Sequence, residues 1–259
     1  MYLILAALGR ELSSLEKMLL QSCRVVKDKT PVVEGRLGQA RVALAQVGIG
    51  RQRSKESAAR LMLQYAPAAV ISLGFAGAVT PELRAGDLLV CPNVYRFDQT
   101  VGNRGSQIGA TIPSDRRLLD AAREALATEP ILHYSGDLLT VEEEVGSPAF
   151  KGWISSTFPV KAVDMESYWV GEVALSKHVP FLAVRAISDT LNDGLPQYNK
   201  FMGPEGEVRP LQAVSYFLTK PHQISLAARL AQNARHASHS LSIFATAFVE
   251  HLSGVAAEP

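Results

Sequence analysis

The segment FLAVRAISD at Phe181–Asp189 decides the fold class of this chain of 259 residues. Its residues are mostly apolar, and it ends on a polar pair, Ser188 and Asp189. A short apolar run of this kind is typical of a strand buried in the centre of a sheet. In open α/β sheets ligands bind beyond the carboxyl ends of the strands, so the polar pair lies where a ligand site is expected.

Five further apolar runs precede this segment, and several are followed by stretches with helical spacing. The other predicted strands are Tyr2–Leu8, Ala40–Val47, Ala69–Leu73, Asp87–Cys91 and Val160–Val163. The predicted helices are Glu11–Gln21, Arg53–Tyr65, Arg116–Ala127 and Ser167–Lys177. This alternation predicts one α/β domain over residues 1–259, with a central mixed, mostly parallel twisted sheet flanked by helices.

The chain changes character after Asp189. Glycine and proline are frequent in Thr190–Pro210, which predicts an irregular loop that can act as a lid. Residues 211–259 form a C-terminal helical region, with a break at Pro221 and a polar stretch at Arg235–Ser240. Its last helix is amphipathic, so we expect it to pack on the sheet or on a second copy in a homodimer, with contact to lipid as the alternative. The apolar residues concerned are Leu226, Leu230, Leu241, Ile243, Phe244 and Phe248.

Net charge and cysteine usage exclude several classes of partner. The 26 basic and 25 acidic residues give a net charge of +1, so no overall field attracts nucleic acid or an anionic membrane. The first apolar run is shorter than the roughly 20 residues that cross a bilayer and lacks a basic leader, so neither stable membrane insertion nor export is indicated. Cys23 and Cys91 have no disulfide or metal spacing, which favours a reducing compartment, the cytoplasm.

No metal site and no cofactor is predicted. The six histidines include no HExxH motif. His236 and His239 share a helix face that permits coordination, but a polar helix surface is the commoner reason for such a pair. The turn Gly48–Gly50 is followed by Arg51-Gln52-Arg53, so the glycine pattern of dinucleotide-binding folds is incomplete.

Glycine and charged residues follow most of the predicted strands. If the carboxyl ends of the strands meet at one edge of the sheet, these residues gather with Asp189 in one crevice. Taken singly, each has an ordinary explanation. The turn Gly48–Gly50 either cradles an anion on its N–H groups or is only a tight turn, and Glu11 alone is typical of a solvated carboxylate in a first helical turn. The segments concerned are Gly9–Glu11, Gly48–Arg51, Gly74–Gly77, Ser135–Asp137 and Asp164–Ser167.

Together these segments resemble the nucleoside phosphorylase and nucleosidase superfamily, and in particular the methylthioadenosine/S-adenosylhomocysteine nucleosidases. The resemblance runs from about Tyr2 to about Leu191. Its most specific parts are VDME at Val163–Glu166 and RAISD at Arg185–Asp189. It implies a nucleoside phosphorylase-like fold, cleavage of the N-glycosidic bond of a purine nucleoside, and no cofactor.

The resemblance makes Asp189 the acid at the purine, Glu166 and Met165 the contacts to the ribose, and Glu11 the group that activates water. Cleavage requires protonation of the base while positive charge develops on the sugar. Asp189, buried near Glu166 and Glu11, would stay protonated, because desolvation and neighbouring carboxylates favour the neutral form. Glu166 would stay ionised and accept the ribose hydroxyls. The further substrate-binding residues that the resemblance implies are Ser188, Phe75, Gly74, Gly50, Ser135, Leu139 and Arg185.

The chain departs from the family pattern at three positions. Phe75 stands where these nucleosidases usually carry a small hydroxyl residue, and Leu139 stands near the position of an aromatic residue that stacks on the base. The identity of the substrate therefore stays open. Phosphorylases of the superfamily commonly carry an arginine where this chain has Ser72, which disfavours phosphorolysis. The remaining candidates for an anion site, each also explained as a solvated side chain, are Arg10, Arg51 and Arg53.

The predicted activity is hydrolysis of a 5′-substituted adenine nucleoside to the base and the substituted ribose. Phosphorolysis of the same bond is the first alternative. DMES at Asp164–Ser167 and the C-terminal helical region also resemble a hopanoid-associated subgroup, whose substrate would be adenosylhopane, a lipid-linked nucleoside. A non-catalytic nucleoside-binding protein is the third alternative, although a binding module has no need of three carboxylates that can exchange protons.

Overall fold

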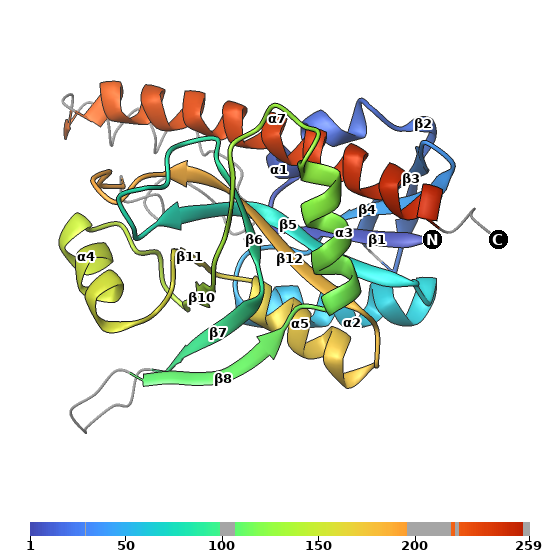
Figure 1. Cartoon of the computed structure of the whole chain (residues 1–259), viewed down its shortest axis with the longest axis horizontal. Coiled ribbons are helices and arrows are strands. Elements are labelled where there is room, and N and C mark those ends of the chain that lie inside the picture. The colour runs from blue at the N-terminus through green and yellow to red at the C-terminus, as the bar shows by residue number, and fades with distance from the viewer. Residues whose placement is uncertain (29, 99–106, 196–218, 221–222, 256–259) are drawn as a thin grey trace.

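Alternate side chains of the first strand are buried on opposite faces of one twisted sheet. On β1 (Tyr2–Ala6), Ile4 and Ala6 join one hydrophobic cluster, whereas Leu3 and Leu5 join another. Successive side chains of a strand point to opposite faces, so each face acquires its own apolar layer. The computed structural model describes residues 1–28, 30–98, 107–195, 219–220 and 223–255, and the two layers lie on either side of its twelve-stranded sheet (Figure 1).

Four parallel strands form the centre of the sheet, namely β4 (Ala40–Gln46), β1, β5 (Ala69–Ala78) and β12 (Phe181–Asp189). Their carboxyl ends lie at one edge, as the sequence predicts. The other strands are β2 (Leu20–Lys27), β3 (Thr30–Leu37), β6 (Leu88–Cys91), β7 (Asn93–Asp98), β8 (Gln107–Pro113), β9 (His133–Ser135), β10 (Leu138–Thr140) and β11 (Ala162–Asp164). Six of the eleven pairings among the described strands are parallel, so the predicted mixed, mostly parallel sheet is confirmed.

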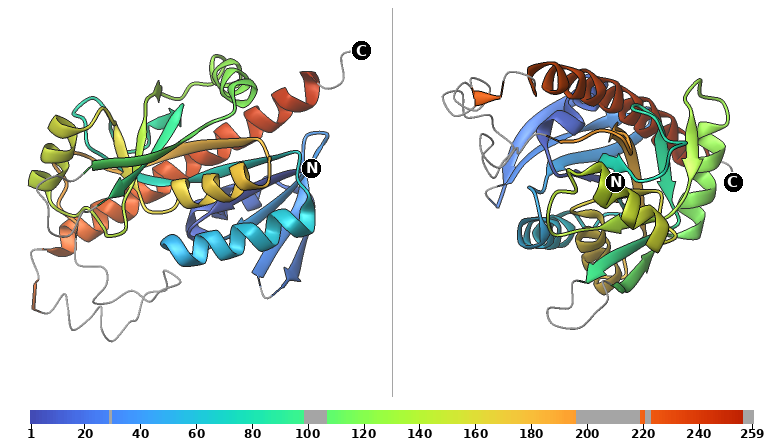
Figure 2. Two further views of the ribbon diagram at one scale, coloured as in Figure 1. Left: turned by 90° about the horizontal axis from the view of Figure 1, so that it is seen from below. Right: turned by 90° about the vertical axis from the view of Figure 1, so that its left-hand side faces the viewer.

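Helices cover both faces of this sheet (Figures 1 and 2). On one face, α7 (Gln223–Val255) contacts α1 (Gly9–Glu16) and α3 (Arg116–Leu126), and it also packs on β12. On the other face, α2 (Arg51–Tyr65) and α5 (Ser167–Ser176) pack together. The N-terminal ends of α1, α2 and α5 lie at the carboxyl edge of the central strands.

The predicted helices and strands are present, with different ends. α1 stops at Glu16 rather than Gln21, because the edge strand β2 begins at Leu20. The side chains of β2 are mostly exposed, so this strand gives no clear apolar pattern. β5 continues to Ala78, so Gly74–Gly77 lies within a strand and not in a turn after one. The elements that the sequence did not predict are β2, β3, β7, β8, β9, β10 and α4 (Pro148–Thr157). Most of them are short or near an edge, so they carry little periodic signal.

α7 runs without a break through the polar stretch at Arg235–Ser240. Ala237 and Ser238 in that stretch are buried, and the Ser238 hydroxyl lies 3.0 Å from the Ser14 hydroxyl of α1. These small side chains allow α7 to lie close against α1. The predicted packing of the last helix on the sheet is confirmed by its buried apolar residues, Leu230, Leu241, Phe244 and Phe248.

Because these apolar residues of α7 are buried within the chain, they do not form the exposed surface from which the sequence predicted a homodimer. The homodimer therefore stays a prediction without the support of this helix. Of the predicted lid, Thr190–Leu195 is described, whereas residues 196–210 lie outside the described residues, as do residues 211–218 and Pro221 of the C-terminal region. Within the part of the chain that the structure describes, no helix is long and apolar enough to cross a membrane.

Candidate active site

Glu11 lies in the first turn of α1, directly after β1, and its carboxylate is buried at the carboxyl edge of the sheet. Its Oε2 accepts a hydrogen bond from the Leu8 N–H (2.6 Å), and its Oε1 accepts one from the Phe75 N–H on β5 (2.7 Å). The first bond also caps α1. Burial raises the pKa of Glu11, whereas the two N–H groups and the Arg185 guanidinium lower it in part. A carboxylate with a raised pKa is better suited to accept a proton near neutral pH.

Two glycines of β5 leave room for the carboxylates. A methyl group at Gly74 would lie 2.9 Å from Oε1 of Glu11, and one at Gly77 would lie 2.7 Å from Oδ2 of Asp189. Real Cβ atoms do not approach other atoms this closely without displacing them. The glycine spacing on β5 is therefore explained by the close approach of two acids, and not by the turn that the sequence predicted.

The turn Gly48–Gly50 holds one of the protein's own carboxylates. Gly50 has a φ of 83°, which favours glycine, and its N–H donates to Oε1 of Glu166 at 2.9 Å. Glu166, directly before α5, is half-buried. Burial and the Asp164 and Glu11 carboxylates raise the pKa of Glu166 to about 8. The sequence predicted an ionised Glu166, but with this pKa the protonated form predominates at pH 7, because burial and its neighbours disfavour the charge.

We expect Glu166→Gln to become more stable relative to the wild type as the pH rises. The folded chain binds the Glu166 proton more tightly than the unfolded chain, so this group's contribution to stability is present below about pH 4.5 and is lost as the pH rises through about 8. Glutamine keeps an acceptor for the Gly50 N–H but cannot ionise. Urea unfolding at pH 5 and pH 9 should therefore show the difference in unfolding free energy moving by roughly 1 to 3 kcal/mol in favour of the variant.

Glu82→Gln is the matched control, because Glu82 is an exposed carboxylate that pairs with Lys161. Its stability difference from the wild type should change little over the same pH range. A constant difference for Glu166→Gln between pH 5 and pH 9 would contradict the raised pKa.

Arg185 is a buried cation behind Glu11 and Glu166. Its Nε and Nη2 donate to Oδ2 of Asp164 (3.0 and 2.9 Å), and its Nη1 donates to the Ser72 carbonyl oxygen (2.7 Å). Nη2 also donates to the Ser72 hydroxyl at 2.9 Å. Arg185 was predicted to bind substrate, but its donors are engaged by protein groups. Its influence on the site is electrostatic, since its positive charge lowers the pKa of both glutamates in part.

β12 ends on Asp189, whose side chain is buried between two donors. The Ser188 hydroxyl donates to Oδ1 (2.7 Å), and Nζ of Lys151 on α4 donates to Oδ2 (2.5 Å). The charged group in contact with Asp189 is thus an ammonium, whereas the sequence predicted neighbouring carboxylates. Lys151 is not among the site residues that the sequence predicted. The Ser-Pro pair at Ser147 and Pro148 signals the start of α4, but nothing local connects that helix to β12.

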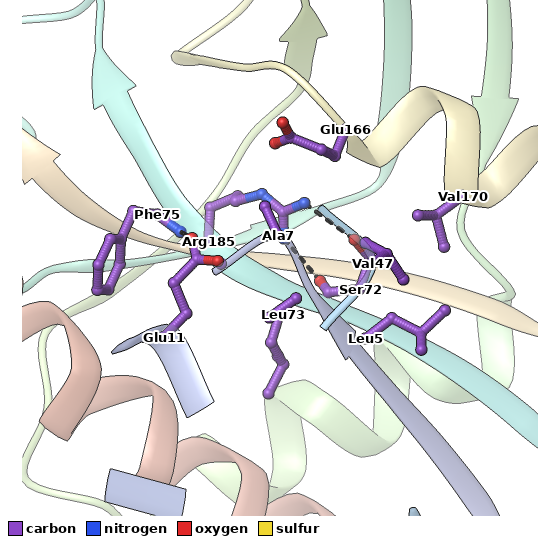
Figure 3. Close-up of a pocket in the computed structure, with 12 residues that line it drawn as sticks. Leu5, Ala7, Glu11, Val47, Ser72, Leu73, Phe75, Glu166, Val170 and Arg185 are labelled. Atoms are coloured by element: carbon purple, nitrogen blue, oxygen red, sulfur yellow. Dashed lines mark hydrogen bonds between the residues drawn. The ribbon is translucent and has the colours of Figure 1, made fainter. Parts of the chain in front are cut away.

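Glu11, Glu166 and Arg185 line one small cavity, together with Ser72 and Phe75 (Figure 3). The centre of a water-sized sphere can move within about 10 Å³ of this cavity, which is about the space that one ordered water requires. Carboxylate oxygens and N–H donors provide the polar partners that such a water needs. The cavity can therefore hold one water between two acids whose pKa values are raised.

The structure does not bring Ser135 and Leu139 to these acids. β9 runs parallel to β6, which runs antiparallel to β12, so Ser135 at the end of β9 points toward the opposite edge from Asp189. Leu139 is fully buried in a third hydrophobic cluster, and Met165 is half-buried beside that cluster. The prediction that all the strand ends meet in one crevice is wrong for β9, because this strand runs against the central ones.

The three arginines considered for an anion site have protein neighbours. The guanidinium carbon of Arg10 lies 5.8 Å from the centre of the Phe75 ring. That of Arg51 lies 4.7 Å from the centre of the Trp169 ring, and the same side chain pairs with Glu142 at the surface. A methyl group at Gly48 would lie 3.2 Å from the Arg53 side chain. Among the described residues, no group of three or more His, Cys, Asp or Glu side chains is arranged to hold a metal ion.

Two buried carboxylates, Glu11 and Asp189, and the half-buried Glu166 lie at one sheet edge, and two of the three line a water-sized cavity, which defines an α/β protein with an acid–base site. Residues 2–218 match the family model of the phosphorylase superfamily. The chain belongs to this superfamily, as its sequence predicted.

Similar proteins include 5′-methylthioadenosine/S-adenosylhomocysteine nucleosidases. That of Anoxybacillus flavithermus is 29% identical over 72% of this chain and 84% of its own length, and that of Staphylococcus saprophyticus is 30% identical over 62% and 73%. Among solved structures, the Neisseria meningitidis nucleosidase in complex with methylthio-immucillin-A has a TM-score of 0.74 and 22% identity, with 96% of this chain and 98% of that chain covered. Helicobacter pylori futalosine hydrolase has a TM-score of 0.72 and 21% identity, covering 94% and 96%. These structures support the predicted fold.

Proposed function

We propose that this protein hydrolyses the N-glycosidic bond of a 5′-substituted adenosine, releasing adenine and the substituted ribose. The observation that carries the proposal is the water-sized cavity between Glu11 and Glu166. The names of the similar proteins, nucleosidases and a hydrolase, support the same reaction class. Three ionisable acids at one sheet edge argue against a module that only binds a nucleoside.

Asp189 serves the leaving base in this proposal. The electrons of the broken C–N bond remain on the purine, so a proton or a hydrogen bond at a ring nitrogen lowers the barrier. Both oxygens of Asp189 accept hydrogen bonds, from Ser188 and from Lys151, which fixes the direction of the carboxyl group at the end of β12. A fixed group contributes more to the transition state than a mobile one, since its orientation is set before the reaction begins.

Glu166 and Glu11 serve the sugar and the water. Ribose hydroxyls that donate to Glu166 favour its ionised form, and a carboxylate beside the ribose stabilises the positive charge that develops there. Glu11 takes a proton from the water as the water attacks the anomeric carbon. Burial raises the pKa of Glu11 and so increases its basicity.

Hydrolysis is favoured over phosphorolysis by the groups at this cavity. An ionised Glu11 would repel an anion, and the Ser72 hydroxyl, at the position of the phosphorylase arginine, accepts a hydrogen bond from Arg185. Arg10 and Arg51 lie over aromatic rings outside the cavity lining.

Phosphate should neither accelerate the reaction nor appear in its product. We expect methylthioadenosine to yield adenine at the same rate with and without 50 mM phosphate (~1000 times a typical micromolar KM), together with the free substituted ribose. Chromatography of the sugar product and the initial rate measure both outcomes. A ribose 1-phosphate whose formation saturates with phosphate would overturn hydrolysis.

The residues around the site bear on the class of the 5′ substituent. Phe75 is half-buried with Arg10 over its ring, beside the backbone N–H that holds Glu11. Since Leu241, Phe244 and Phe248 of α7 are buried in the core of this chain, they give no support to a lipid-linked substituent such as that of adenosylhopane. A panel of methylthioadenosine, S-adenosylhomocysteine and an adenosyl lipid separates the possibilities by kcat/KM. The cytoplasmic location and the homodimer stay predictions.

A further inference from the structure

Lys151 is a fully buried lysine with three protein acceptors. Its Nζ donates to Oδ2 of Asp189 (2.5 Å), to the carbonyl oxygen of Thr190 (2.7 Å) and to that of Asp193 (3.2 Å). An ammonium has three N–H donors, so these three acceptors satisfy it completely. A buried lysine is rare because removing its charge from water is costly without such partners.

The same ammonium ties together parts of the chain that are far apart in sequence. α4 carries Lys151, whereas the last residue of β12 and the segment that follows it supply the three acceptors. Asp193 in that segment accepts from the Thr190 N–H and hydroxyl, each at 2.8 Å, and from Arg229 of α7. The backbone after Asp189 is therefore fastened to α4 and α7 at the carboxyl edge of the sheet.

We infer that Lys151 is the positioning residue for Asp189 in the proposed hydrolysis: it fixes the direction of the Asp189 carboxylate at the end of β12. The inference rests on the proposed function. Lys151 acts through Asp189, because its three N–H groups are all engaged and leave none for a substrate. Ser188 holds the other carboxylate oxygen, so the two donors together define the direction of the acid.

Other charged groups around the pair come from several elements. Glu144, in the segment before α4, has its pKa raised to about 7, by burial first and then by Asp189, and Arg10 of α1 and Lys151 oppose this. Asp193 has its pKa lowered, since its hydrogen bonds from Thr190, with Arg229 and Lys151, outweigh its burial. Lys151 is the cation that directly contacts the Asp189 carboxylate among these described groups.

Two substitutions separate the charge of Lys151 from its geometry. Lys151→Met keeps much of the volume and removes the charge, whereas Lys151→Arg keeps the charge but not the compact threefold donor. For Lys151→Met we expect kcat at its own optimum to fall by a factor of roughly 10 to 100 with KM changed by less than about threefold.

Lys151→Arg should also lower kcat with little change in KM, because it keeps the charge but not the compact threefold donor. Lys161→Met is the matched control, because Lys161 forms a partly exposed pair with Glu82, and it should retain the wild-type kcat and KM. Circular dichroism and the binding of a nucleoside analogue establish that each variant is folded. A folded Lys151→Met enzyme with the wild-type kcat would overturn the inference.

The double variant Lys151→Met/Asp189→Asn distinguishes the inference from the function on which it rests. If Lys151 acts through Asp189, the double variant should turn over no more slowly than Asp189→Asn alone. Independent losses that multiply would overturn the positioning role. An inactive Asp189→Asn enzyme beside a Lys151→Met enzyme of wild-type activity refutes the inference alone, whereas an active Asp189→Asn enzyme refutes the proposed function. In the double variant both charges of the buried pair are removed together, so no buried carboxylate is left without a cation. This variant therefore provides a second test if Lys151→Met does not fold.

Discussion

Replacing Asp189 by asparagine is expected to lower the turnover of adenine nucleosides by a factor of roughly 100 to 10,000, the range for loss of a general acid. The amide has the shape of the carboxylate and still offers an acceptor to Ser188 or Lys151, but it is a far poorer acid. Because Lys151 then lacks its charged partner, the unfolding free energy should also fall by up to about 3 kcal/mol. Single-turnover release of adenine by enzyme shown to be folded measures the effect.

Asp115→Asn provides the matched control for this substitution. Asp115 caps α3 by accepting from the N–H groups of Arg117 and Leu118, and asparagine caps a helix about as well. Its activity should stay within about twofold of the wild type. If Asp189→Asn also kept its activity within a few-fold of the wild type, Asp189 would no longer qualify as the acid.

Glu11→Gln should lower kcat by a factor on the order of 100 or more, because glutamine cannot take a proton from water. A tight-binding nucleoside analogue should still bind, since the proposed contact of Glu11 is to the water and not to the nucleoside. Both oxygens of Glu11 accept backbone N–H groups, so the NH₂ of glutamine leaves one of those donors without an acceptor. We expect a loss of stability of roughly 1 to 3 kcal/mol. Stopped-flow turnover, calorimetric binding and urea unfolding measure the three quantities.

Glu16→Gln is a control on the same helix. Glu16 pairs with the exposed Arg24 at the surface, so its loss should change kcat little. A Glu11→Gln enzyme that loses analogue binding as completely as turnover would assign Glu11 to the nucleoside instead. An enzyme with unchanged kcat would leave Glu11 as a helix cap with no part in the chemistry.

The local sequence determined the central strands of this protein and the acids that follow them. β1, β5 and β12 are buried on both faces, so each is a continuous apolar run that stands out from its surroundings. Parallel strands end at the same edge, and Glu11 and Asp189 come at the end of two of these runs. The motif at Val163–Glu166, through its resemblance to a known family, added Glu166. None of this required long-range contacts.

Only the tertiary structure decided how those acids are held. The Gly50 N–H reaches Glu166 across 116 positions of sequence, and Lys151 reaches Asp189 across 38. The opposite direction of β9, which takes Ser135 away from the site, follows from its pairing with β6. Such contacts depend on strand direction, register and helix placement, which leave no periodic signal near the residues themselves. The sequence therefore determined which carboxylates meet at the edge of the sheet, whereas the packing of α4 against the end of β12 decided that a buried ammonium, and not another acid, contacts Asp189.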